Sequence, residues 1–295
     1  MQHVPPALAS GGRGGGGGRG TLLLGRLPRP GAPRGLSRVV SLDGLKADIV
    51  EVGRRLYARG LIGGNEGNVS VREGDVLYIT PAAVCKGFLT PEQIVATDLE
   101  GRPKGGGRAS TEVRMHTAVY QRRPDVKAVV HAHPPTATAF AVAGIPLDRP
   151  ITAEAVVTLG PVPIIPYGMP ATPDLAENVG RAICEAQAVL LAHHGALAVG
   201  DSIWRAWERM ETLEQVARVA LAARSLGREQ ELPGPDVRRL ESARTAAGYP
   251  PPVCVDCPTC GTSVAVGTGD QVVLTRSELA RLLAEAVERF GGARS

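Results

Sequence analysis

Two histidines, His131 and His133, follow an apolar segment and are separated by one residue. At this spacing both could serve a chemical site at the end of a strand. The apolar and β-branched residues within 126–130 predict a buried strand. Residues two apart on a strand face the same side, and Pro134 ends the strand just beyond the pair. Two neutral imidazoles on one face are half of a transition-metal site, or else a hydrogen-bonded pair at a strand end.

A second apolar segment, residues 188–192, also ends in histidines, His193 and His194, followed by Gly195. Either histidine could join the first pair, and His194 is favoured because Gly195 lets backbone and ligand approach closely. Three imidazoles plus a water form an open zinc site of the catalytic type. A Ser-His-Asp triad is a weaker interpretation, because the sequence contains no Gly-x-Ser-x-Gly motif.

The segment Ser110-Thr111-Glu112 opens a predicted helix and could contribute polar side chains to a site. The alternative role for all three residues is helix capping, with the hydroxyls at the N-cap and Glu112 beside the positive end of the helix dipole. His116 lies four residues on, on the same helix face. The loop 65–71, which contains Asn68, could bind an anion through backbone N–H groups and an amide, or be an ordinary tight turn.

Alternating helices and short strands predict an α/β fold. From the residue pattern we expect helices at 45–61, 110–123, 135–142, 174–186 and 203–226, and a short helix with a strand within 89–98. We expect further strands after the loop 65–71, at 76–80, at 126–130 with the histidines at its end, at 163–165 and at 188–192.

Composition excludes several classes of function. The chain of 295 residues has a formal charge of +4, but residues 1–42 hold six arginines and no acid, which leaves 27 basic against 29 acidic residues elsewhere. A near-neutral body with 3% aromatic residues is unlike a nucleic-acid-binding protein. No apolar run reaches the ~18 residues of a membrane-spanning helix. Five unevenly placed cysteines favour a reducing cytoplasm over secretion.

The order of five motifs resembles one known family, the class II zinc-dependent aldolases, which includes the adducin head domain. The resemblance covers roughly residues 43–227 and rests on residues 67–70 (Gly-Asn-Val-Ser), 79–81 (Ile-Thr-Pro), 110–112 (Ser-Thr-Glu), 131–133 (His-Ala-His) and 193–195 (His-His-Gly). It implies a central, mostly antiparallel sheet flanked by helices, and usually a homotetramer with sites at subunit contacts.

The resemblance also implies a role for each motif. Zinc would be bound by His131, His133 and His194, the acid/base would be Glu112, and the phosphate of a sugar phosphate would be bound by Asn68, Ser110 and Thr111. The implied reaction is cleavage or formation of a short ketose phosphate through an enediolate that the metal stabilises. An epimerase, decarboxylase or dehydratase on the same metal, and a non-catalytic adducin-like interaction domain, are the alternatives.

This sequence departs from the family at two places. Ala82 and Ala83 follow Thr80-Pro81, where the family often has a hydroxyl residue and then glycine. Residues 152–154 show no counterpart of the tyrosine that assists proton transfer in one member. Both departures leave the substrate and the reaction open.

The chain is expected to contain four parts: a disordered Gly/Arg-rich tail at 1–40, the aldolase-like domain at 41–228, a proline-containing linker at 229–262, and a strand with an amphipathic helix at 263–295. Cys254, Cys257 and Cys260 in the linker form Cys-x-x-Cys-x-x-Cys and could bind a second metal, but no fourth ligand is near. Sharing between subunits, an iron–sulfur cluster with an outside ligand, or three idle thiols are the options.

The C-terminal helix carries a capping box from Thr275 to Glu278 and one apolar stripe from Leu279 to Phe290. The stripe could pack on its own oligomer or dock into the groove of a partner. It resembles the terminal targeting peptides of enzymes in bacterial microcompartments, so a microcompartment shell is one expected partner, with a location inside the compartment.

Overall fold

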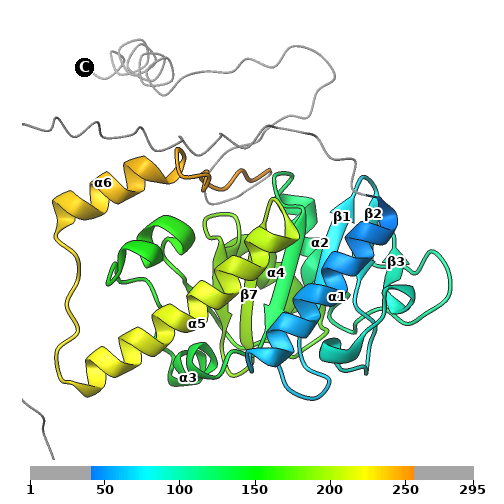
Figure 1. The fold of residues 1–295 in the computed structure, drawn as a ribbon, viewed down its shortest axis with the longest axis horizontal. Coiled ribbons are helices and arrows are strands. Elements are labelled where there is room, and N and C mark those ends of the chain that lie inside the picture. Colours follow the sequence, from blue (N-terminus) through cyan, green and yellow to red (C-terminus); the bar gives the residue numbers. More distant parts are fainter. Residues whose placement is uncertain (1–40, 256–295) are drawn as a thin grey trace, which may run out of the picture. The chain divides into compact units, whose positions relative to one another are not determined.

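A seven-stranded sheet with helices on both faces forms the body of the protein in the computed structural model, which describes residues 41–255 (Figure 1). The strand order is β3-β2-β1-β4-β7-β6-β5, and every neighbouring pair is antiparallel except β5 with β6. The predicted α/β class with a central, mostly antiparallel sheet is therefore confirmed. Its elements are α1 (Leu42–Ala58), β1 (Asn68–Glu73), β2 (Val76–Ile79), β3 (Val95–Thr97), α2 (Val113–Arg122), β4 (Ala128–Ala132), α3 (Pro135–Ala143), β5 (Ile164–Ile165), α4 (Pro173–Ala182), β6 (Ala188–Leu191), β7 (Gly195–Gly200), α5 (Ile203–Ser225) and α6 (Gly234–Arg244).

Three helices begin at side-chain caps that the sequence encodes. The hydroxyls of Ser41, Thr172 and Ser202 accept hydrogen bonds from backbone N–H groups in the first turns of α1, α4 and α5. Such caps satisfy donors that the helix itself leaves without a partner. They explain why these helices begin close to the predicted positions.

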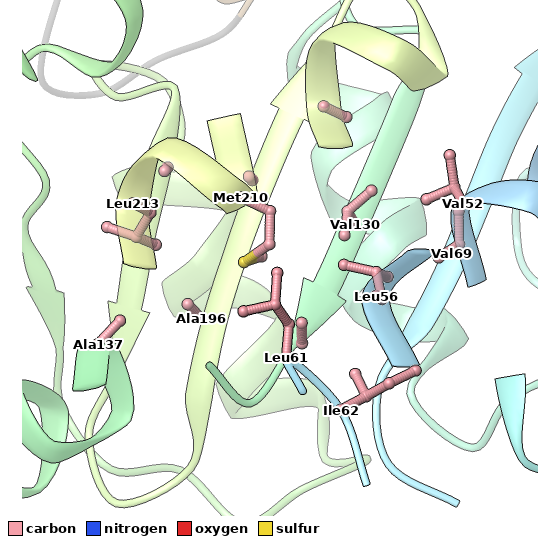
Figure 2. Close-up of a cluster of buried hydrophobic side chains, with 14 of the residues drawn as sticks. Val52, Leu56, Leu61, Ile62, Val69, Val130, Ala137, Ala196, Met210 and Leu213 are labelled. Atoms are coloured by element: carbon pink, nitrogen blue, oxygen red, sulfur yellow. The ribbon is translucent and has the colours of Figure 1, made fainter. Parts of the chain in front are cut away.

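The sheet separates two apolar layers. Helices α1, α3 and α5 cover one face, and Figure 2 shows their side chains meeting those of β1, β4 and β7. Helices α2 and α4 cover the other face. Because side chains alternate along a strand, Val130 of β4 belongs to the first layer and Val129 to the second. His131 shares the side of Val129, so it faces α2.

The described part of the predicted linker, residues 229–255, contains α6 and a segment that packs on the body. Pro235 and Asp236 lie in the first turn of α6, where both residue types favour a helix start. Arg244 at its end donates to the Val157 carbonyl, and the Tyr249 hydroxyl donates to Glu208. The prolines of this region were interpreted as linker signals, whereas one of them starts a helix.

Several sequence predictions lie outside the described residues: the tail at 1–40, Cys257, Cys260, and the helix at 263–295. Within residues 41–255, none of the helices combines the length and the apolar character that crossing a membrane requires.

Candidate active site

The three predicted ligands meet at one point. His131 is the fourth residue of β4, His133 follows the end of that strand, and His194 lies in the turn between β6 and β7. Their ring centroids lie 4.8–5.0 Å apart, and their candidate ligand nitrogens are all within 4.8 Å of one another. The two-residue spacing on β4 therefore places both imidazoles on one side, as the strand period predicts.

The turn between β6 and β7 directs His194, rather than His193, toward the cluster. His193 has a left-handed backbone with φ 55°, is exposed, and lies near the Tyr167 ring instead. A Cβ on Gly195 would lie 2.6 Å from the Ala132 carbonyl oxygen. Only glycine leaves room for this close approach of β7 to β4, which supports the preference for His194 over His193.

The arrangement of the imidazoles suits a divalent metal. His131 Nδ1 lies 2.9 Å from the Ala196 carbonyl oxygen, which can only accept, so Nδ1 carries a proton and Nε2 is the ring nitrogen left to bind a metal. The Nε2 atoms of His131 and His133 are 3.2 Å apart. Two nitrogens on one tetrahedral zinc, each at ~2.0–2.1 Å, would be separated by about 3.3 Å.

Electrostatics keep the other two imidazoles neutral, as metal ligands must be. Burial, and then charge on the neighbouring histidines, lower the pKa of His133 to about 3. Burial and His131 also lower the pKa of His194. Both side chains are therefore free of the extra proton near pH 7 and can offer a lone pair.

Glu112 faces this cluster from the position just before α2. Its Oε2 lies 3.2 Å from His131 Nε2, and its Oε1 lies 3.3 Å from His194 Nε2. Oε1 is buried and receives no hydrogen bond from the described residues. Burial alone would raise the pKa of Glu112, but His131, His194 and the Asn68 amide outweigh it and lower that pKa. An ionised, incompletely satisfied carboxylate beside three imidazoles is an environment that a cation would satisfy.

A buried hydrogen-bond relay that sequence reasoning missed holds Glu112 from behind. The Asn68 amide Nδ2 donates to Glu112 Oε2 at 2.8 Å, and its Oδ1 lies 2.5 Å from His116 Nε2. An amide oxygen only accepts, so His116 Nε2 carries the proton and Nδ1 accepts from the Ser70 hydroxyl at 2.6 Å. Tyr120 then contacts Ser70 at 2.8 Å. The signal in the sequence was the shared face of Glu112 and His116 on α2.

The residues expected to bind phosphate lie close to the metal cluster but differ in their contacts. The Asn68 side chain is occupied by Glu112 and His116, so it positions the carboxylate. Ser110 is buried, and its hydroxyl accepts from the Glu112 N–H at 3.3 Å. Thr111 is exposed. Ser110 also donates its backbone N–H to the Thr80 carbonyl, which brings the Thr-Pro and Ser-Thr-Glu motifs together.

Ala83, in one of the two positions that depart from the family, has a left-handed backbone with φ 57°. That conformation suits glycine, since a Cβ makes it unfavourable. The loop therefore keeps the path that a glycine would take although the sequence has alanine there.

Cys254 has a partner that could not be recognised from the sequence. The structure joins it to Cys184 in a disulfide, with 5.2 Å between their Cα atoms and 70 residues between them in sequence. Cys184 lies far from the Cys-x-x-Cys-x-x-Cys motif in sequence, so the motif's spacing does not point to it. Metal binding by Cys254, Cys257 and Cys260 stays a prediction.

Comparison with known proteins agrees with this geometry. The model of the Class II Aldolase and Adducin N-terminal domain matches residues 47–221. An L-fuculose phosphate aldolase of Methanococcus maripaludis is 35% identical over 172 residues, which are 58% of this chain and 93% of that protein. A 3-oxo-tetronate 4-phosphate decarboxylase of Haemophilus influenzae is 34% identical over 180 residues, 58% of this chain and 84% of that protein.

A solved structure shows the same fold. The L-fuculose-1-phosphate aldolase from Thermus thermophilus matches with a TM-score of 0.58 and 37% identity, covering 62% of this chain and 95% of that one. The matched family region contains the three histidines, Glu112 and the relay behind it. On these grounds the chain belongs to the class II aldolase and adducin family.

Proposed function

We propose that this protein is a metal-dependent lyase that cleaves or forms a short ketose phosphate, with His131, His133 and His194 as the ligands of one zinc ion. The observation that carries the proposal is the buried Glu112 carboxylate, with its pKa lowered, facing three clustered imidazoles. A divalent metal bound there supplies Lewis-acid polarisation of the substrate carbonyl. A non-catalytic role is disfavoured, because binding of a partner does not require this set of residues.

Glu112 is the proton-transfer group in this proposal. In the synthetic direction its carboxylate takes a proton from the carbon beside the carbonyl, and in cleavage it returns that proton. Its lowered pKa fits the accepting role, since the group is ionised in the resting protein. Asn68 holds one carboxylate oxygen, and the other is directed at the cluster.

We place the substrate phosphate where the loop that begins at Thr80-Pro81 meets Ser110-Thr111. Thr111 is exposed there and can offer its hydroxyl and backbone N–H. Ser110 lies beneath it and orients Glu112. This assigns Asn68 to the carboxylate rather than to the phosphate, because both ends of its amide are already engaged, by Glu112 and by His116.

A decarboxylase is the second candidate, favoured by the 34% identical relative of that activity. Loss of carbon dioxide from a 3-oxo acid and cleavage of an aldol both break the bond between the carbon beside a carbonyl and the next carbon. Where the carbon beside the carbonyl bears a hydroxyl, both leave an enediolate. Glu112 would protonate that carbon in either case. An epimerase or dehydratase would use the same residues with a different substrate.

The proposal includes assembly and location in the cell. A cytoplasmic homotetramer is expected from the family resemblance, and the exposed Tyr57–Phe88 ring pair, 5.1 Å between centroids, is an apolar surface suited to a subunit contact. Docking to a microcompartment shell would depend on the helix at 279–290.

The test is a screen of zinc-loaded protein against short ketose phosphates and 3-oxo acid phosphates. Release of dihydroxyacetone phosphate with an aldehyde would identify an aldolase, and release of carbon dioxide a decarboxylase.

With the substrate found, Glu112→Gln should keep the metal but lower kcat by about 10²–10⁴-fold, the usual value of a positioned acid/base. Unchanged kcat would leave Glu112 only its place at the start of α2.

A further inference from the structure

The loop between α1 and β1 brings a second carboxylate, that of Glu66, to the histidine cluster. Its Oε2 lies 3.8 Å from His133 Nδ1. The other ring nitrogen, His133 Nε2, points into the cluster and lies 3.2 Å from His131 Nε2. Glu112 therefore faces the metal-binding nitrogens, whereas Glu66 faces one proposed ligand from behind. The proposed reaction makes no use of Glu66.

A turn at residues 63–66 holds the Glu66 side chain in place. The Glu66 N–H donates to the Gly63 carbonyl at 2.9 Å, and Glu66 Oε2 accepts from the Gly63 N–H at 3.0 Å. The oxygen that is held in this way is the one that faces His133. A side chain that closes its own turn has fewer rotamers open to it, so the carboxylate stays beside the imidazole although it is partly exposed.

Two contacts attach this turn and His133 to the same part of the body. Lys86 is 3% exposed, and its ammonium donates to the Asn65 carbonyl at 2.7 Å. The His133 N–H donates to the Leu61 carbonyl at 2.9 Å, just before the turn. The fold, and not the attraction between the two side chains alone, therefore brings Glu66 and His133 together.

The three histidines differ in what their outer nitrogens meet. His131 Nδ1 has the Ala196 carbonyl at 2.9 Å, and His133 Nδ1 has Glu66. His194 Nδ1 is buried and has no hydrogen-bond partner among the described residues. An imidazole that binds a metal through one nitrogen keeps a proton on the other, and an acceptor there fixes the ring and makes the ligand more basic. An ionised carboxylate is a stronger acceptor than a carbonyl.

The length and exposure of the pair determine how much it can contribute. At 3.8 Å the two atoms interact through charge or through one bridging water, because a direct hydrogen bond is shorter. The side chains of His133 and Glu66 are 21% and 50% exposed, so solvent and salt weaken the attraction. A bound divalent ion adds positive charge to the ring. The carboxylate therefore stabilises the metal-loaded protein more than the metal-free one, which raises the affinity for the metal.

We propose that Glu66 is a positioning residue for His133, which holds the outer N–H of this ligand and raises the affinity of the cluster for zinc. Glu66 acts through His133 and is neither a ligand nor a proton-transfer group. The inference rests on the proposed function only in requiring a metal at the three histidines, whichever carbon–carbon bond the protein breaks.

The test measures the zinc Kd of the full chain and its variants by competition with a chromogenic chelator at low salt. Glu66→Gln should weaken zinc binding by about 10-fold, the lower end of the ~10–100-fold effect of such partners, because the pair is partly exposed. Glu73→Gln is the matched control. It removes the same charge from an exposed carboxylate at the other end of β1 from the cluster, and it should leave the Kd unchanged. In about 0.5 M salt the difference between the two variants should shrink.

Nitrogen-15 NMR of the zinc-loaded protein gives a readout that a general loss of stability would not produce. The Nδ1–H groups of His131 and His133 should each give a downfield proton signal that exchanges slowly with water. Glu66→Gln should move the His133 signal upfield and speed its exchange. The His131 signal is the internal control and should stay, because its acceptor is the Ala196 carbonyl.

The outcomes separate this inference from the proposed function. Equal zinc Kd values for Glu66→Gln and Glu73→Gln, or an unchanged His133 signal in Glu66→Gln, would overturn the positioning role and leave the ligand set in place. Zinc bound by His194→Ala as tightly as by the unmodified protein would overturn both. Tight zinc binding that Glu66→Gln weakens, without turnover of any substrate tried, would support the positioning role and count against the proposed function alone.

Discussion

At the scale of single residues, the site is built around Glu112, whose two carboxylate oxygens have different surroundings. Oε2 accepts from Asn68, which the relay through His116 and Ser70 holds, and it also faces His131; Oε1 accepts no hydrogen bond from the described residues and faces His194. A buried carboxylate held on one side only keeps its orientation while remaining able to exchange a proton on the other. This division of roles favours proton transfer over a purely structural function.

The adjacent histidines in the β6–β7 turn offer a matched test of metal binding. His194→Ala should remove the metal and with it the activity, because three imidazoles are needed for the open site. His193→Ala should keep both, since that side chain is exposed and directed away. Metal analysis of the two variants checks this, and stoichiometric metal in His194→Ala would rule out the ligand set. His133→Ala is expected to behave like His194→Ala.

His116 should make the stability of the protein depend on pH. Burial, and then the nearby His131, lower the pKa of His116 to about 3, below its ordinary value. The unfolded chain therefore binds more protons than the folded one between about pH 3 and 6.5, so stability falls as the pH falls through that window. The slope from this group approaches ~1.4 kcal/mol per pH unit.

Urea unfolding at several pH values, compared with His116→Gln under the same metal load, isolates this contribution. The variant is expected to be less stable near pH 7, and its stability should change less between pH 6.5 and 4. Parallel pH profiles for the two proteins would contradict the assignment of a neutral, buried His116.

The sequence predicted which histidines and which carboxylate lie together, but not the buried residues that hold them in place. His131 and His133 were identified because the strand period is local, and Glu112 because its motif opens a helix. Ser70 and Tyr120 lie 46 and 50 residues from their partners His116 and Ser70. Contacts at such separations depend on how β1 and α2 pack, which periodicity does not report. Cys184 was missed for the same reason.

At the scale of elements, tight turns rather than helices determine the site. The loop after β2 holds Ala83 in a left-handed conformation, and the turn before β7 does the same with His193. Helices were predicted within a few residues because apolar spacing and caps are written in consecutive residues. Strand β7 was not predicted, because its small residues lack β-branched or aromatic character. Helix α6 was mistaken for linker.

Ala83→Gly should stabilise the protein. A left-handed alanine costs about 1–2 kcal/mol, and glycine gives back ~0.5–1 kcal/mol through the entropy of the unfolded chain. The net gain is on the order of 0.5–1 kcal/mol, or a rise in Tm of about 1–4 °C. Thermal unfolding measures it, with Ala82→Gly as the control that should lower Tm. A lower Tm for Ala83→Gly would show that the loop does not hold this conformation.

At the scale of the whole molecule, catalysis and attachment are assigned to different parts of the chain. The family region ends at residue 221, and the described segment beyond α5 returns to the body through Arg244, Tyr249 and Val255. The expected helix at 279–290 lies beyond that segment. Among the described residues, the side-chain hydrogen bonds, ion pairs and ring contacts of the histidine cluster involve none after residue 200, so the site should not need the C-terminal end.

Deleting residues 263–295 should therefore leave kcat and KM unchanged and abolish recruitment to a microcompartment shell. The measurement pairs kinetics with co-purification of shell proteins, using a fluorescent protein that carries residues 263–295 as the positive control. Loss of folding or of tetramer assembly in the deleted protein would instead assign the apolar stripe to the oligomer.

Because His131 donates to the Ala196 carbonyl, the orientation of this proposed metal ligand depends on the register of β7 against β4 and not on the β7 side chains. A substitution at residue 196 leaves the carbonyl in place. A deletion within β7 moves another residue opposite His131 and reverses which side chains face α2, because the strand period is two. In a library of random variants selected for activity, we therefore expect small apolar replacements at residues 196–199 to survive more often than insertions or deletions in β7, while both end glycines stay fixed.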